Sequence, residues 1–195
     1  MANSSIRLAP PRLTRDALTD KRWVVVNDGG HVLTSQHNTH LSNLPASFFS
    51  ILAHVEHMDE TPVPEAYRPS FTNTYTLRVG PSRDPERARS FFESIKALQV
   101  LEDTLGPNIS VHSPIKVDSA GIQLQLNVPI ADSDNIPMAV PLTLFDDHAR
   151  IQSLGEYMRD FPHGDIDFMI VLRQFSPDPS IRQVRVYTQL ARLCH

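Results

Sequence analysis

Cysteine and glycine are both scarce in this sequence. The single cysteine, Cys194, excludes an intramolecular disulfide and is typical of a protein in a reducing compartment. Only seven glycines stand against sixteen prolines, and the pair Gly29-Gly30 indicates a hairpin turn, not a phosphate-binding loop. The polar N-terminus lacks the apolar segment of a signal peptide, and nowhere do about 18 apolar residues follow one another. We therefore expect a cytoplasmic protein with no membrane partner.

A surplus of basic residues is also absent. The chain has 18 lysines and arginines against 22 aspartates and glutamates, which gives a net charge of -4 and a pI near 6.1. Because cationic side chains hold a phosphate backbone, this balance predicts no nucleic-acid partner. It leaves open a small local basic patch. The hydrophobic content of 41% is ordinary for a globular protein, and 195 residues suit one domain with extensions.

The sequence predicts a flexible polar arm over residues 1–20 and a single domain over residues 21–195. Within the domain, a β-branched run at residues 23–27 and a second run at 31–34 flank an Asp-Gly-Gly turn and predict a hairpin.

Two helices are predicted. Apolar residues at helical spacing indicate the first over residues 45–58. The second, over residues 85–105, begins with Asp84 as N-cap and Pro85 at the first helical position, and Gly106-Pro107 ends it. Its apolar stripe should pack against the concave face of a sheet, and it includes Phe91, Phe92, Ile95 and Leu98.

The remaining segments have the composition and alternation of strands, namely residues 71–79, 109–117, 122–130, 138–145, 150–158, 166–175 and 183–193. The strands after the second helix have no helical gap between them, so neighbours should pair as an antiparallel meander. Gln123, Gln125 and Asn127 alternate with apolar residues and predict a sheet with one wet face.

The order of these elements resembles a known family. Residues 144–157 (Leu-Phe-Asp-Asp-His-Ala-Arg-Ile-Gln-Ser-Leu-Gly-Glu-Tyr) look like the penultimate hairpin of ketosteroid isomerase and the SnoaL-like cyclases. The sequence of a helix, Asp59, Tyr67, a strand and the Phe91-Phe92 helix runs in the same order. The resemblance covers residues 46–160. It implies an α+β fold in which a curved antiparallel sheet forms a cone around a long helix, flanked by strands in residues 21–45 and 161–195. The resemblance also implies a homodimer through the wet outer face of this sheet.

The family's catalytic groups are missing from the matching positions. The resemblance places its general-base aspartate at or beside Tyr75, its oxyanion-hole aspartate at Pro141 and its oxyanion-hole tyrosine near Ile51. Only a pocket tyrosine, Tyr67, is retained. The resemblance therefore implies the family's concave pocket but not the reaction that the family catalyses.

Glu156 is the candidate catalytic group in that cup. If Phe145 points inward, strand alternation brings Glu156 inward as well. Burial would then disfavour the charged form of its carboxyl group, which would allow it to act as a general acid or base near neutral pH. The alternative is that Glu156 lies at the rim, solvated or paired with Arg159. Tyr75 and Tyr67 are candidate hydrogen-bond donors or, alternatively, core residues. The predicted ligand contacts are Thr143, Asn73, Phe145, Met158, Ile51 and Phe92.

Two functions follow from this reading. The first is a cofactor-independent isomerase, cyclase or dehydratase of the SnoaL-like type that acts on a hydrophobic polycyclic or polyketide-like molecule. The second is a non-catalytic interaction or dimerisation module of the nuclear-transport-factor-like kind. The histidine pairs His37/His40 and His54/His57 are a weak metal pattern, and we expect neither a metal nor another cofactor.

The C-terminal strands allow two arrangements. Residues 166–175 and 183–193 are separated by Ser-Pro-Asp-Pro-Ser and should form a hairpin that extends the main sheet and covers an edge. In the alternative, this hairpin is the final strand pair of the cone itself, which would move the cup away from Glu156.

Overall fold

The computed structural model describes residues 10–19, 21–25, 31–35, 48–62, 73–104, 110–129, 143–145, 151–153, 165–178 and 181–194. The helices in these ranges are α1 (Arg15–Leu18) and α2 (Pro85–Thr104). The strands are β1 (Lys21–Val25), β2 (His31–Ser35), β3 (Phe48–Pro62), β4 (Asn73–Gly80), β5 (Ser110–His112), β6 (Ile115–Asp118), β7 (Gly121–Pro129), β8 (Thr143–Phe145), β9 (Ile151–Ser153), β10 (Asp165–Asp178) and β11 (Ile181–Cys194).

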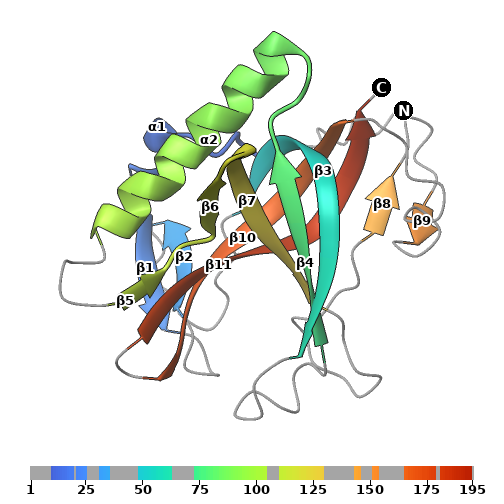
Figure 1. Ribbon diagram of the computed structural model, residues 1–195. Coiled ribbons are helices and arrows are strands. Elements are labelled where there is room, and N and C mark those ends of the chain that lie inside the picture. The colour runs from blue at the N-terminus through green and yellow to red at the C-terminus, as the bar shows by residue number, and fades with distance from the viewer. Residues whose placement is uncertain are drawn as a thin grey trace, which may run out of the picture.

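Five of these strands close into a barrel (Figure 1). β3, β4 and β7 form an antiparallel meander, and β10 pairs antiparallel with both β3 and β11. The ring closes where β11 pairs parallel with β7. A meander followed by a hairpin whose last strand lies parallel to the third is the strand order of the OB fold. The β1–β2 hairpin extends the sheet from β10, and β8–β9 extends it from β11.

The barrel interior follows from strand alternation, since every second side chain of a strand faces the same side. The inward set consists of apolar residues that are at most 3% exposed: Phe49, Ile51, Ala53, Val55, Leu77, Val79, Leu124, Leu126, Val128, Ile166, Phe168, Ile170, Leu172 and Val186. Full burial of each large side chain contributes about 1.5–3 kcal/mol. All five strands supply this core, so none of them is peripheral.

Helix α2 begins at Pro85, as the capping pattern of the sequence predicts. Asp84 Oδ1 accepts a hydrogen bond from the Arg87 backbone N–H at 2.9 Å, and the predicted bounds agree with Pro85–Thr104 to within one residue. Phe91 is fully buried against the barrel, whereas Phe92 is 38% exposed. The prediction that Phe92 packs against a sheet is therefore wrong, because a turn of about 100° per residue carries it off the buried stripe.

The predicted cone around a long helix is wrong. Residues 45–58, predicted as a helix, contain the first part of strand β3, and the sheet closes on itself as a barrel. Phe49, Ile51, Ala53 and Val55 alternate with the period of a strand, and β3 has a partner on each side, β4 and β10. Those two neighbours satisfy its backbone groups and override the helical spacing. The isomerase and cyclase character that the cone implied loses its basis.

Several predicted strands are confirmed. β1 and β2 pair as the expected hairpin, and β4 lies where residues 71–79 alternate. The segment 109–117 is divided into β5 and β6 on either side of Ser113-Pro114. Gly121, with a φ of 127°, opens β7 directly after the turn at Asp118, a backbone conformation that favours glycine.

The C-terminal hairpin is confirmed, but it does not cover an edge. β10 and β11 pair from Asp165↔Cys194 to Asp178↔Ile181. β10 lies between β3 and β11, and it contacts β2 only at Arg173 and Gln174. The hairpin therefore supplies two of the five barrel strands and is not an extension of a finished sheet.

The later part of the predicted arm is attached to the barrel. The Leu13 backbone N–H donates to Ser50 O at 3.0 Å, and the Ser50 N–H donates to Pro11 O at 2.9 Å. Leu13 is fully buried, and Ser94 Oγ of α2 donates to its carbonyl at 2.9 Å. Residues 10–19 are thus held between β3 and α2, in contrast to the flexible arm predicted for residues 1–20.

Thr188 on β11 is fully buried, and its hydroxyl has no hydrogen-bond partner among the described residues. A buried polar group without a partner costs about 1–3 kcal/mol. We expect Thr188→Val to raise the free energy of unfolding by about 1 kcal/mol in urea denaturation. Thr76→Val, which removes a bonded hydroxyl on the barrel exterior, is the matched control and should give no gain. A less stable Thr188→Val protein would contradict the expectation.

Candidate ligand-binding site

A polar hollow of about 310 Å³ lies on the outside of the barrel, where β4, β7 and β11 run side by side. Its volume falls in the range of small-molecule sites. Its lining comes from five strands and the residues beside them: Asp59, Thr76, His112, Ser113, Pro114, Gln125, Asn127, Gln183, Val184 and Arg185. Most of these side chains can form hydrogen bonds, so the hollow suits a polar ligand.

Strand register aligns part of the lining in a row across the outer face. Asp59 of β3 pairs with Thr76 of β4, Thr76 pairs with Asn127 of β7, and Asn127 pairs with Tyr187 of β11. The inward residues between them, such as Leu126, are fully buried. The predicted wet face of this strand is therefore confirmed for Gln125 and Asn127.

Internal hydrogen bonds orient two of the three amides in the hollow. Thr76 Oγ1 donates to Asn127 Oδ1 at 3.1 Å. Arg185 donates to Gln183 Oε1 from Nε at 3.1 Å and from Nη2 at 2.8 Å. A guanidinium can only donate, so Gln183 must turn its oxygen toward Arg185. Asn127 and Gln183 are left with their NH₂ groups to offer to a ligand.

Acidic groups at the hollow are engaged within the protein. Asp59 Oδ1 lies 2.9 Å from His57 Nε2. Ser113 Oγ donates to Glu102 Oε1 at 2.5 Å and accepts from the Ile115 backbone N–H at 2.9 Å. Partial burial raises the pKa of Glu102, and the hydrogen bond from Ser113 opposes that rise because it favours the charged form. Ser113 bonds a carboxylate and, within the described residues, no histidine, so it lacks the base of a serine nucleophile.

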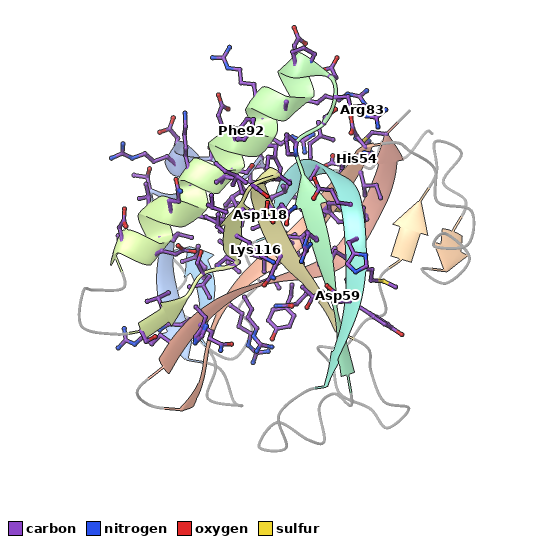
Figure 2. The ribbon with its side chains drawn as sticks, viewed as in Figure 1. His54, Asp59, Arg83, Phe92, Lys116 and Asp118 are labelled. Carbon is purple, nitrogen blue, oxygen red and sulfur yellow. The ribbon has the colours of Figure 1, made fainter. Side chains whose placement is uncertain are left out.

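Cationic side chains flank the hollow on the same outer face. Arg78 pairs with Gln125 across β4 and β7, and Lys116 pairs with Gln123 across β6 and β7. Figure 2 shows Lys116 on β6. Arg78 Nε is buried and has no hydrogen-bond partner within the described part of the chain.

A second polar cluster, the Asp165 cluster, lies at the beginning of β10. Asp165 Oδ2 accepts from Ser82 Oγ at 2.6 Å and from Arg87 Nη1 at 3.0 Å, and His54 Nδ1 lies 3.7 Å from its Oδ1. Asp167, two residues on, pairs with arginines of the N-terminal segment and of β11. Figure 2 shows His54 near Arg83 and the start of α2, with Asp59 further along β3. This cluster joins chain segments and is separate from the hollow.

The structure does not gather the predicted site residues into one pocket. Ile51 is fully buried inside the barrel, and Tyr75 packs partly buried against the same core. Phe92 lies on α2, and none of these three lines the hollow. Asn73 belongs to β4, whereas Thr143 and Phe145 belong to β8. The other three predicted site residues lie outside the described residues and stay predictions: Glu156, Tyr67 and Met158.

The described residues contain neither a cluster of metal ligands nor a helix able to cross a membrane. Within the described ranges, no three histidine, cysteine, aspartate or glutamate side chains come together as metal ligands. His54 and His57 both lie on β3, and the pair His37/His40 is outside those ranges. Neither described helix combines the length and apolar character needed to cross a bilayer.

Comparison with solved structures gives a similarity that extends over most of the chain. No protein family matches the sequence, and no curated protein matches it. Among solved structures, the chain is similar to the single-stranded DNA-binding protein from bacteriophage Enc34. The two share 9% sequence identity with a TM-score of 0.43, over 88% of this chain and 89% of that one.

The prediction that nucleic acid is excluded as a partner has to be corrected. It was drawn from the net charge, and a net charge of -4 says nothing about where charges lie. Arg185 lines the hollow, and Arg78 pairs with Gln125, another lining residue. Local cationic side chains, not the total, meet a phosphate backbone.

Proposed function

We propose that this protein binds single-stranded nucleic acid across the outer face of β4, β7 and β11. The observation that carries the proposal is the polar hollow on that face, with Arg185 in its lining and Arg78 beside it. In OB folds, the face of the second and third strands holds oligonucleotides or oligosaccharides, and these strands correspond here to β4 and β7.

The charges favour a polyanion over a neutral sugar chain. Arg185 donates to the neutral amide of Gln183 and belongs to the lining of the hollow. Asp59 is paired with His57, and Asp118 accepts from the Ala120 backbone N–H. These carboxylates have hydrogen-bond partners within the protein, and Arg78 supplies a second guanidinium beside the hollow. Phosphate oxygens are suitable acceptors for such donors.

The test is binding of a fluorescein-labelled 12-nucleotide single strand, followed by fluorescence anisotropy at 50 to 200 mM salt. We expect micromolar affinity at the lowest salt and a fall in affinity as salt rises. Arg78→Gln should weaken binding about three- to tenfold and reduce the slope of log affinity against log salt by about 0.7, the value for one phosphate contact of a single strand.

Arg89→Gln is the matched control, because Arg89 is 84% exposed on α2, away from the hollow. It removes the same charge and should leave affinity and salt slope unchanged. Absence of salt-dependent binding to any single strand, or equal effects of the two substitutions, would overturn the proposal.

A further inference from the structure

The hollow offers donors at fixed places and an acceptor that can adjust. The NH₂ groups of Asn127 and Gln183 face a ligand, since the oxygens of both amides accept internal hydrogen bonds. The third amide, Gln125, precedes Asn127 by two residues on the same face of β7, and its side chain makes no hydrogen bond to a described residue. It can therefore turn its oxygen toward a ligand N–H.

Bases differ in how well they complement this arrangement. Thymine and uracil present two carbonyl oxygens on either side of a single N–H. Cytosine has an amino group in place of one carbonyl and an unprotonated ring nitrogen in place of the N–H, and adenine has no carbonyl. Guanine keeps a carbonyl beside an N–H but carries an amino group on the other side. Each amino group adds donors that need acceptors. A donor left without an acceptor in a desolvated site is costly. Two fixed NH₂ groups with one adjustable amide oxygen thus match thymine or uracil best.

Stacking contributes little to the choice of base here. No phenylalanine, tyrosine or tryptophan is among the described residues that line the hollow. Stacking on aromatic rings accepts every base, whereas hydrogen bonds to base edges in single strands discriminate between them. An amide-lined hollow should therefore bind with base preference.

We propose that the hollow is a base-selective subsite that prefers thymine or uracil, an inference that rests on the single-strand binding proposed above. Asn127 and Gln183 donate to the two base carbonyls, and Gln125 accepts from the N–H. Thr76 is a positioning residue, because its hydroxyl holds the Asn127 amide in the donating orientation.

The experiment compares 12-nucleotide strands of thymidine and of deoxycytidine, together with an abasic strand that reports backbone binding alone. We expect the thymidine strand to bind about fivefold or more tightly than the deoxycytidine strand, the factor that one net hydrogen bond supplies. Thr76→Val frees the Asn127 amide to turn and should bring the two affinities within about twofold of each other. The affinity for the abasic strand should not change.

Thr188→Val makes the same chemical change on the inward face of β11 and should keep the preference. Gln183→Met removes the second donor and should also lower the preference. Equal affinities of the two base strands for the unmodified protein, both salt-dependent, would overturn the base-selective subsite and leave the proposed function intact. A preference that survives in both Thr76→Val and Gln183→Met would overturn it too. Absence of binding to all strands, the abasic one included, would overturn both proposals.

Discussion

Phe168→Ala is expected to lower the free energy of unfolding by about 3–5 kcal/mol. Phe168 is fully buried in the barrel interior, where it pairs with Ile51 of β3 and Ala191 of β11. Removal of the ring takes away its transfer free energy and leaves a cavity that three hydrogen-bonded strands cannot close. Urea denaturation followed by circular dichroism measures the loss.

Phe92→Ala is the matched control, since it removes the same ring from a side chain that is 38% exposed. Its ring keeps an edge contact with Phe91 at a centroid distance of 5.7 Å. We expect a loss below about 1.5 kcal/mol, because much of the ring remains in water in the native protein. Equal losses for Phe168→Ala and Phe92→Ala would contradict the barrel core described above.

Asp165→Asn is expected to lower the free energy of unfolding by about 2–3 kcal/mol. The Asp165 side chain is 9% exposed and accepts hydrogen bonds from Ser82 and Arg87. Hydrogen bonds to a charged group contribute more than neutral ones, and the substitution removes the charge that accepts from Ser82 and Arg87. Thermal and urea unfolding at neutral pH test this.

Asp59→Asn provides the comparison at an exposed ion pair. Asp59 and His57 have side-chain exposures of 53% and 57%, and exposed pairs contribute at most about 1 kcal/mol. Loss of stability should therefore be small for Asp59→Asn, and salt should change it more than it changes the effect of Asp165→Asn. A large effect at Asp59 with none at Asp165 would mean that the Asp165 cluster does not hold the fold together.

Local rules in the sequence predict α2 because its start and its buried face are encoded in neighbouring residues. Asp84 caps the helix and Pro85 suits its first position. The turn at Asp118 and Gly121 and the C-terminal hairpin have similarly local causes. These elements could be predicted without knowledge of the rest of the chain.

β3 shows where local reasoning fails. Phe48, Ile51, Leu52 and Val55 have helical spacing, and Phe49, Ile51, Ala53 and Val55 have strand spacing, within one short segment. The choice between them depends on β4 and β10, and β10 lies far along the chain. Barrel closure through the parallel pairing of β7 with β11 is equally non-local, so alternation alone does not reveal it.

The candidate site was predicted only in part. Alternation in β7 marked Gln125 and Asn127 as outward-facing, which the structure confirms. Their companions Thr76, Gln183 and Arg185 were missed, although each follows the same alternation on its own strand. The sequence does not show that β4, β7 and β11 lie side by side. That arrangement joins the solvent-facing sides of the three strands into one polar surface.

The position of the C-terminal hairpin also affects how the chain reaches its native state. Arg12 bonds Asp167 across a separation of 155 positions, and the pairs between β3 and β10 join residues that are 111 to 123 positions apart. Contacts between such distant segments slow folding, since the loop entropy is lost before the contacts form. During synthesis, the edges of the β3–β4–β7 meander at β3 and β7 stay unpaired until β10 and β11 leave the ribosome. Exposed strand edges are prone to aggregation, so the chain is most exposed to aggregation in this interval.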